Sequence, residues 1–415
     1  MCQIGAIMDL FNVLTVKDTS KLIDDNFDYE LESELVKLPD ATGRIVKYDI
    51  KAKENVPDFR RSTVDGYAVF SRDVFGASES IQSILDLNGE ILMGEEAKGH
   101  ITIPGQCYYV PTGGMLPNGA DSVIMIEYTE KLDDTTILTS KATSPGENVI
   151  EIGEDIKKDE VVIKKGTRLR AYEIGVLASL GFYEVEVYKK PVIGIISTGD
   201  EVVHPSQSIK IGQIRDINTY LLNSIAEDKG CIPVRYGLIK DEYELLKMTL
   251  EKAVSECDIV LISGGSSVGK KDNTVKVIED LEDGELLVHG ISVKPGKPTI
   301  IGKSKGKIIF GLPGHPLACA VIFQVMVKYY IEKITEHKEK VYPITCKFKL
   351  NYHKAKGREE YLPVTIEEKD EELLASPVFG KSGLITSFSK AYGFVRIERN
   401  EEGIKEGQNV KVYKF

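Results

Sequence analysis

The most informative stretch of the sequence reads Asp258-Ile-Val-Leu-Ile-Ser263-Gly264-Gly265-Ser266-Ser267-Val268-Gly269. It begins as a short, continuous apolar run, which is typical of a parallel strand that is covered on both faces. Glycines follow directly, and a segment with helical character begins near Asn273. A strand that passes through a glycine-rich turn into a helix is a building unit of α/β sheets.

Elements of the same kind flank this stretch on both sides. Strands are expected at Val192–Ser197, Ile232–Leu238 and Asp258–Ser263, and helices at Asn218–Lys229, Glu242–Glu256 and Asn273–Leu281. This alternation predicts an open, mostly parallel α/β sheet domain over residues 188–336. Ligands of such sheets bind in the loops after the carboxyl ends of the strands, so these loops are where we expect the chemistry.

The remaining regions have a different character. Residues 51–147 contain short alternating runs separated by the turn signals Asn88-Gly89, Pro104-Gly105 and Pro117-Asn118-Gly119, which predicts a β-rich domain. Residues 8–50 and 148–187 are mixed, with helices around Ser20–Asn26 and Ala171–Leu180.

Residues 337–415 return to strand-like alternation. Strands are expected at Cys346–Leu350, Tyr361–Ile366, Phe394–Ile397 and Val410–Phe415, which fits a small β-barrel or sandwich. A central α/β domain with three satellite regions is therefore the expected architecture.

Composition limits the function. The chain has 415 residues and a formal net charge of −11, which opposes binding to nucleic acid. Its apolar runs are far shorter than the roughly 20 residues that span a bilayer, and no export signal is visible. The six cysteines are scattered, without zinc or disulfide spacing, as in a soluble cytoplasmic protein with reduced thiols. Any anionic ligand would need local cations and backbone amides to bind.

The glycine-rich loop meets that requirement. Its glycines Gly264, Gly265 and Gly269 allow backbone N–H groups to converge on an anion, and the following helix adds its positive end. Lys270 and Lys271 supply the local cations. Asp272 is then open to two interpretations, as the cap of the next helix or as a Mg²⁺ ligand beside bound phosphates.

Other acids also follow strands of the predicted sheet. Asp200 and Glu201 lie at the end of the first strand, where a metal or substrate role is favoured. Asp216 and Asn218 are similar cases. For Asp241, which comes just before a predicted helix, the plain helix cap is the stronger interpretation.

Two Pro/Gly-rich loops stiffen the chain at strand ends. Lys294 and Lys297 add cations in the first loop, and His315 in the second is expected to be a structural residue rather than a general base. In the β-rich region, Asp65-Gly66 and Pro111-Thr112-Gly113-Gly114 predict ordinary turns. On physical grounds alone, neither of these turns would be singled out.

Several stretches, in their order along the chain, resemble the molybdopterin molybdenumtransferase family, which is called MoeA in bacteria and is represented in animals by the E domain of gephyrin. They are FRRSTVDGYAV, PTGGMLPNGADSVIM, GEDIKKDEVVIKKGTRL, ISTGDEVV, GQIRDIN, SGGSSVGKKD, VKPGKPT and GLPGHP, and they extend from about Asn55 to Leu317. Weaker similarity (GREEYLPV, KSGLITS) continues into the C-terminal region. Each motif is weak alone, whereas the ordered set is specific.

The resemblance implies an elongated four-domain homodimer. The first domain (8–50 and 148–187) would be split by the inserted β-rich domain (51–147), followed by the molybdopterin-binding α/β domain (188–336) and a C-terminal β-barrel (337–415). Its active cleft would lie between the α/β domain of one subunit and the inserted domain of the other. Other proteins of molybdenum-cofactor biosynthesis are compatible partners.

The implied reaction takes adenylylated molybdopterin and molybdate, cleaves the adenylyl phosphoanhydride in a Mg²⁺-dependent step and leaves molybdenum on the dithiolene. By the resemblance, Asp65, Thr112, Glu201 and Asp272 would be catalytic, with Glu201 and Asp272 handling the metal ion. The substrate-binding positions would be Gly264, Gly265, Ser267, Gly269, Lys294, Lys297, Asp155, Asp241, Arg358 and Ser382.

Two other functions remain open at this stage. Molybdopterin adenylyltransferase would use a fold like that of the α/β domain alone, and the additional domains argue against it. A non-catalytic dimeric scaffold is the second alternative. It is disfavoured because scaffolding by gephyrin depends on a further fused domain.

Overall fold

The computed structural model describes residues 13–264, 273–380 and 383–415. The chain forms two compact units. Unit 1 contains the chain up to Leu35, Gly43–Lys47 and Glu186–Phe415, and unit 2 contains Val36–Thr42 and Tyr48–Val185. The finer four-domain boundaries expected from the sequence remain a prediction.

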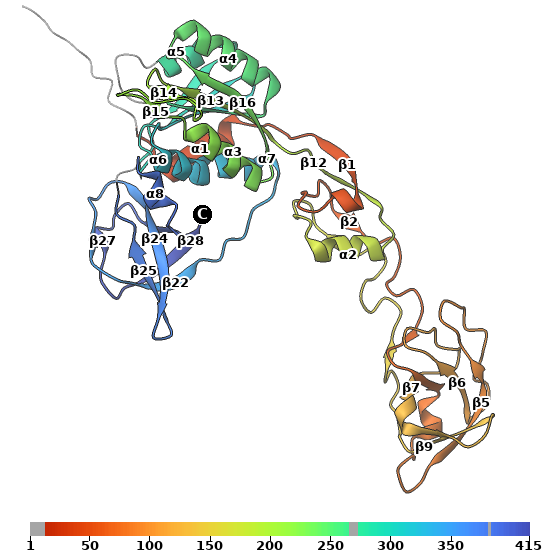
Figure 1. The fold of residues 1–415 in the computed structure, drawn as a ribbon. Helices are drawn as coiled ribbons and strands as arrows, with labels where there is room; N and C mark the ends of the chain where they lie inside the picture. The colour runs from red at the N-terminus through yellow and green to blue at the C-terminus, as the bar shows by residue number, and fades with distance from the viewer. Residues whose placement is uncertain (1–12, 265–272, 381–382) are drawn as a thin grey trace, which may run out of the picture. The chain divides into compact units, whose positions relative to one another are not determined.

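A six-stranded sheet lies within unit 1, in the order β16-β13-β17-β21-β20-β18 (Figure 1). The first four strands are parallel, and β20 and β18 continue the sheet in antiparallel fashion. The open, mostly parallel sheet is thus confirmed. The bounds are β13 Val192–Thr198, β16 Ile232–Ile239, β17 Ile259–Ser263, β18 Glu285–His289, β20 Ile300–Ser304 and β21 Lys307–Leu312.

Helices cover both faces of this sheet. Helices α4 and α5 lie on one face, and α1, α3, α6 and α7 lie on the other (Figure 1). The bounds are α1 Val16–Asn26, α3 Asn218–Asp228, α4 Tyr243–Glu256, α5 Asn273–Glu279, α6 Pro316–Ile322 and α7 Lys328–Ile334, with a π-helical turn at Phe323–Val327 between the last two.

Strand β17 shows why the sequence requires two helical layers. Its residues are all buried, with Ile259 and Leu261 in the core on the α7 side and Val260 and Ile262 in the core on the α4 side. Successive side chains of a strand point to opposite faces, so a continuous apolar run demands cover on both.

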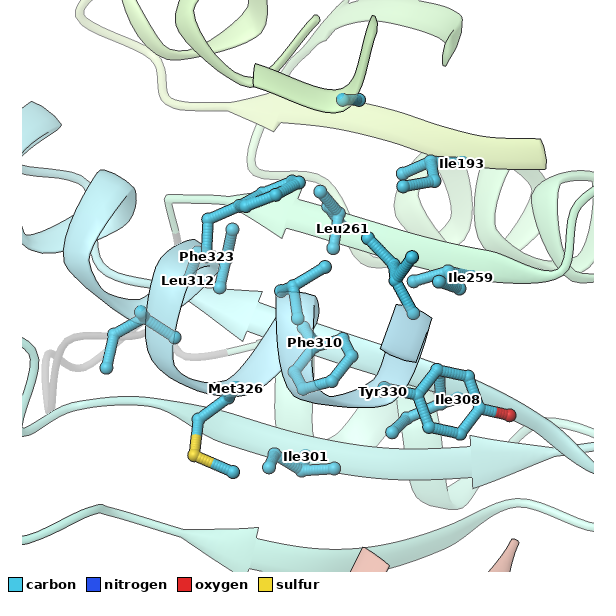
Figure 2. Close-up of a cluster of buried hydrophobic side chains, with 14 of the residues drawn as sticks. Ile193, Ile259, Leu261, Ile301, Ile308, Phe310, Leu312, Phe323, Met326 and Tyr330 are labelled. Atoms are coloured by element: carbon cyan, nitrogen blue, oxygen red, sulfur yellow. The ribbon is translucent and has the colours of Figure 1, made fainter. Parts of the chain in front are cut away.

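The core beneath α6 and α7 is the larger of the two. Figure 2 shows Phe323, Met326 and Tyr330 of the helical layer packed around Phe310 and its neighbours on the sheet. Phe310, Phe323 and Tyr330 are among the largest side chains that are fully buried. Burial of apolar surface, aliphatic and aromatic, is the dominant favourable term in folding.

The C-terminal part of unit 1 is a closed five-stranded barrel. Strands β24, β25, β22, β28 and β26 pair in a ring, because β26 also pairs with β24. The expected barrel is confirmed, although β25 was not foreseen. The bounds are β22 Ile344–Phe348, β24 Glu359–Lys369, β25 Glu372–Pro377, β26 Gly393–Ile397 and β28 Asn409–Lys414; the smaller elements are β19 Val293–Lys294, β23 Tyr352–His353, β27 Gly403–Ile404 and α8 Ile385–Phe388.

Unit 2 contains a second six-stranded sheet, in the order β7-β4-β6-β5-β9-β8. The bounds are β4 Gly66–Val69, β5 Ser83–Glu90, β6 Gln106–Val110, β7 Ser122–Met125, β8 Thr129–Lys131 and β9 Thr136–Thr139. The β-rich region is thus confirmed, but the turn expected at Asn88-Gly89 is wrong. Both residues lie inside β5, where its register with β6 shifts between Leu87 and Glu90.

The rest of unit 2 consists of short pairings around helix α2. Strand β2 pairs with β11, and β3 pairs with β10. Strand β1 pairs with β12, and the chain passes from one unit to the other within these two strands. The bounds are α2 Ala171–Ser179, β1 Ser33–Lys37, β2 Ile50–Lys51, β3 Arg61–Ser62, β10 Val149–Ile150, β11 Val161–Ile163 and β12 Glu184–Tyr188. None of the described helices has both the length and the apolar composition needed to cross a bilayer.

We predict that Phe310→Ala destabilises the protein far more than Phe379→Ala. Phe310 is fully buried, so its truncation should lower the free energy of unfolding by about 3–5 kcal/mol. Phe379 is 66% exposed, and its truncation should change that energy by less than about 0.5 kcal/mol. Guanidinium unfolding followed by circular dichroism measures both. Equal effects would contradict the assignment of Phe310 to the core.

Candidate functional site

A cavity of about 530 Å³ opens at the carboxyl ends of the parallel strands in unit 1. The ends of β13 and β17 and the loop after β21 form its wall together with the start of α3. Pockets of this size at this edge of an α/β sheet are the usual ligand sites of the fold. The wall residues include Thr198, Glu201, Arg215, Asp216, Asn218, Asp241, Ser263, Gly264, Pro298, Gly314, His315 and Gly383.

Gly264 lies where two strand ends converge. Its φ angle is +104°, and a Cβ atom at this position would lie 2.3 Å from the carbonyl oxygen of Thr198. Its N–H donates to the carbonyl oxygen of Leu312, 3.4 Å away. Only glycine fits this backbone conformation and this contact. The strand-to-loop geometry foreseen for the glycine-rich stretch is therefore present up to Gly264.

Asp241 is held inside the cavity wall. The Thr198 hydroxyl donates to its carboxylate, and its own N–H donates to the Asp200 carboxylate at 3.3 Å. The side-chain amide of Asn273 donates to the Asp241 carbonyl oxygen at 3.2 Å. The helix-cap interpretation of Asp241 is wrong, because α4 begins at Tyr243 and its N-cap residue is Glu242.

Asp216 and Asn218 lie in the same wall. Asp216 is 8% exposed, and its carboxylate accepts the Thr219 N–H at 3.1 Å and the Ser197 hydroxyl at 3.4 Å. The Asn218 amide donates to the Ser263 hydroxyl at 2.7 Å and to the Gly314 carbonyl oxygen at 2.8 Å. Buried polar groups with this many partners are rigidly placed.

Arg215 is a cavity residue that the sequence analysis missed. It ends the short strand β15 (Ile214–Arg215), which pairs in parallel with β14 (Val202–Val203). Its Nε donates to the Pro205 carbonyl oxygen at 3.0 Å. An anionic ligand of a chain with a net charge of −11 needs nearby cations, and this requirement could have directed attention to Arg215, which directly precedes Asp216.

Cys319 of α6 is a buried thiol that neighbours Ser263 of the cavity wall. Burial raises the pKa of Cys319 to about 12, and the contact with Ser263 lowers it only in part. The thiol therefore stays protonated near neutral pH, which disfavours a nucleophilic role. This agrees with reduced, structural cysteines.

The carboxylates suit a hard cation. Mg²⁺ is usually bound by one or two carboxylates together with substrate phosphates and water. Glu201 and Asp241 both line the cavity and provide such oxygens. Across residues 13–264, 273–380 and 383–415, no group of three or more His, Cys, Asp or Glu side chains could hold a metal ion by itself. The oxygens of Glu201 and Asp241 are of the kind that Mg²⁺ takes when it is shared with a phosphate.

Lys294 and Arg358 come from distant parts of the sequence; Lys294 ends strand β19, and Arg358 directly precedes the neighbouring strand β24. Strand β19 pairs in parallel with β24, with Val293 opposite Glu359 and Lys294 opposite Glu360. Arg358 directly precedes Glu359 and is exposed. Lys297 precedes Pro298 of the cavity wall.

Asp65 and Thr112 meet within unit 2. The Thr112 N–H donates to the Asp65 carboxylate at 2.8 Å, and both side chains are exposed. The two turns are further joined by the Ser62 N–H to Gly114 carbonyl bond (2.9 Å) and the Gly113 N–H to Ser62 carbonyl bond (2.8 Å). Two turns that seemed ordinary in the sequence thus form one polar surface feature.

The other predicted site residues are less informative. Asp155 is exposed in unit 2, and its N–H donates to the Val56 carbonyl oxygen at 3.1 Å. The remaining predicted positions, Gly265, Ser267, Gly269, Asp272 and Ser382, lie outside the described residues.

Three family models match the chain in order. The MoeA N-terminal region (domain I and II) matches residues 14–181, the probable molybdopterin binding domain matches residues 194–333, and the MoeA C-terminal region (domain IV) matches residues 345–415. These matches span both the cavity-bearing α/β sheet and the closed barrel.

Individual relatives align over almost their whole length. A Methanocaldococcus jannaschii protein named for molybdopterin biosynthesis is 35% identical over 417 residues, which cover 97% of this chain and 98% of the relative. The molybdopterin molybdenumtransferase of Haemophilus influenzae is 31% identical over 414 residues, covering 97% and 99%.

A solved structure extends this agreement to three dimensions. The crystal structure of a molybdopterin biosynthesis MoeA protein from Pyrococcus horikoshii is 38% identical, has a TM-score of 0.83 and covers 97% of this chain and 99% of its own. Because sequence, fold and the order of the regions all agree along the chain, this protein belongs to the MoeA family.

Proposed function

We propose that the protein is a molybdopterin molybdenumtransferase that acts on adenylylated molybdopterin and molybdate. In the proposed reaction an oxygen of water or molybdate attacks the adenylyl phosphorus, the phosphoanhydride bond breaks and AMP leaves. Molybdenum forms bonds to the two dithiolene sulfurs, and one molybdate oxygen leaves with the two thiol protons as water. The observation that carries the proposal is the polar cavity at the carboxyl ends of β13, β17 and β21, in a chain of which 97% aligns with the Haemophilus influenzae transferase of this name.

The cavity has the groups that such a substrate requires. Gly264, the first residue of the glycine-rich stretch, lies in the cavity wall. Main-chain N–H groups of such a stretch are suited to bind phosphate oxygens, and we assign them this task. Arg215 of the cavity wall supplies positive charge for the phosphates, and Lys294, Lys297 and Arg358 are proposed to add N–H donors. Asp216 and Asn218 provide fixed polar groups that can orient the heterocyclic part of a substrate.

Glu201 and Asp241 are proposed to hold Mg²⁺ against the substrate phosphates, with Asp272 as a further ligand. When bound, Mg²⁺ would stabilise the negative charge that develops on the leaving phosphate. The bond from the Thr198 hydroxyl fixes the Asp241 carboxylate before substrate arrives. Preorganisation of this kind avoids rearrangement during the reaction.

We further propose a cytoplasmic homodimer in which Asp65 and Thr112 of one subunit act at the cavity of the partner subunit. The support is the resemblance stated from the sequence, together with the hydrogen bond that presents Asp65 and Thr112 on one exposed surface.

The central experiment is an assay of the purified protein with adenylylated molybdopterin, molybdate and Mg²⁺. We expect AMP, detected by chromatography, together with molybdenum in the pterin product, detected by mass spectrometry. Glu201→Gln should slow AMP release by about 100-fold or more, because it removes a carboxylate ligand of the proposed Mg²⁺ ion.

The matched control is Glu227→Gln, an exposed acid on α3 that does not line the cavity and should leave the rate unchanged. Absence of AMP with the folded wild-type protein would refute the proposal. Formation of adenylylated molybdopterin from ATP instead would establish the adenylyltransferase alternative.

The dimeric arrangement predicts complementation between two damaged subunits. A heterodimer of an Asp65→Ala subunit and a Glu201→Gln subunit should keep about half of the wild-type rate, because one of its two sites receives only intact residues. Each homodimeric variant should be nearly inactive. An inactive heterodimer, or a monomer in analytical ultracentrifugation, would contradict the shared site.

A further inference from the structure

Strand β24 of the barrel holds the segment that carries Lys294. The Glu359 N–H donates to the Ser292 carbonyl oxygen at 3.0 Å, and the Ser292 hydroxyl donates to the Gly357 carbonyl oxygen at 2.7 Å. With the parallel pairing of Lys294 and Glu360, these bonds fix the backbone on both sides of Val293. These bonds leave only the Lys294 side chain free to change its direction.

Glu360 restricts that freedom. Lys294 Nζ lies 2.8 Å from Glu360 Oε1, and the Tyr352 hydroxyl donates to the same oxygen at 2.7 Å. The Glu360 side chain is 5% exposed, whereas the Lys294 side chain is 52% exposed. A buried carboxylate is costly unless it is paired and hydrogen-bonded, so Glu360 has a strong requirement for this ammonium group.

The adjacent acid, Glu359, has a separate partner. Successive side chains of a strand point to opposite sides, and Glu359 Oε1 lies 2.8 Å from Arg396 Nε and also accepts the Tyr361 hydroxyl. Glu359 and Glu360 are both buried and both paired with a cation. Glu359 is therefore a suitable control for Glu360, because the two residues differ mainly in the cation with which they pair.

Lys294 is within reach of the cavity. Pro298 of the cavity wall follows four residues later, and four residues span at most about 14 Å. At Gly296 a Cβ atom would lie 2.6 Å from the Ile322 side chain, so this loop packs closely against α6. The lysine is thus attached to the cavity wall by a short and confined segment.

An ammonium group has three N–H donors. When one of them is directed at Glu360, the others remain on the exposed side of the lysine. The pair as a whole adds almost no net charge, so Lys294 would act through the direction of its donors rather than through a general positive field. A lysine without this contact would lose its fixed direction, because its four-carbon chain has many rotamers.

We propose that Glu360 is a positioning residue that directs Lys294 Nζ toward an anionic oxygen of the substrate, either of a phosphate or of the metal oxyanion. The inference rests on the proposed function, in which Lys294 contacts substrate. It assigns to the barrel a task in the reaction, since β24 supplies the acid that orients a lysine of the α/β domain.

The test compares Glu360→Gln with Glu359→Gln in the AMP-release assay on the full-length protein. Glutamine keeps the shape of the side chain and an oxygen that accepts the Tyr352 hydroxyl, but it removes the charge. We expect Glu360→Gln to lower kcat by about 10- to 100-fold through misplacement of Lys294. KM for adenylylated molybdopterin should fall or stay constant at low salt, because the unpaired lysine adds positive charge.

A purely structural role of Glu360 would change kcat and KM in a different way. If the substitution only unfolds part of the protein, the apparent kcat falls in proportion to the folded fraction, and Glu359→Gln should show the same loss. If it distorts the substrate site, KM for adenylylated molybdopterin rises. Thermal melts of both variants report the folded fraction. Glu359→Gln should keep the wild-type kcat, and equal kcat values for the two variants would overturn the inference.

The variant Lys294→Met provides a second comparison. If Glu360 acts through Lys294, the change Glu360→Gln in the Lys294→Met background should alter kcat by less than about twofold, because coupled residues are not additive. A further loss of about 10-fold in that background would overturn the inference. If Glu360→Gln alone does not fold, the kcat of the double variant is compared with that of Lys294→Met, and the same two outcomes support or overturn the inference.

The outcome for the wild-type protein separates the two proposals. If the wild type releases no AMP, the proposed function fails and the role of Lys294 falls with it. If the wild type releases AMP but Glu360→Gln behaves like Glu359→Gln, only the positioning role fails.

Discussion

At position 264 the chain has no room for a side chain, because a Cβ atom there would lie 2.3 Å from the carbonyl oxygen of Thr198. This close approach brings the carboxyl ends of β13 and β17 together at one edge of the sheet. Thr198 then orients Asp241, and Ser263 accepts from Asn218, so both strands contribute to one cavity wall. The rest of the site depends on this constraint.

The two helical layers explain why the strand ends can be held so firmly. Each strand in the middle of the sheet is packed on both faces, as Figure 2 shows for the layer around Phe310. A rigid scaffold of this kind allows loops to carry the chemistry without stabilising the fold themselves. The same principle applies at the barrel, where β24 fixes the Lys294 segment through backbone pairing.

Much of the central architecture could be predicted from the sequence, because continuous apolar runs and glycine-closed helices are local signals. The strand Asp258–Ser263 and the helix Asn218–Lys229 agree with the structure within one residue at each end. Glu201 and Gly264, which follow the ends of β13 and β17, line the cavity, while their roles remain predictions. These features depend on short stretches of chain.

What the sequence could not show depends on contacts between distant residues. The Asp65–Thr112 hydrogen bond spans 47 positions, and the turn patterns on each side look ordinary. Asp241 looked like a helix cap because its partner Thr198 is 43 positions away. Asn88-Gly89 has the composition of a turn, yet the pairing of Leu87 and Glu90 with β6 on either side keeps it inside β5. In each case a long-range interaction outweighed the local signal.

The decisive observation would be a crystal structure of the full-length protein with adenylylated molybdopterin, prepared without molybdate so that the ligand is not consumed. The account predicts that the ligand occupies the cavity beside Asp241, with its phosphates within hydrogen-bonding distance of the backbone turn at Gly264. A ligand bound elsewhere, with the cavity filled by water alone, would contradict it.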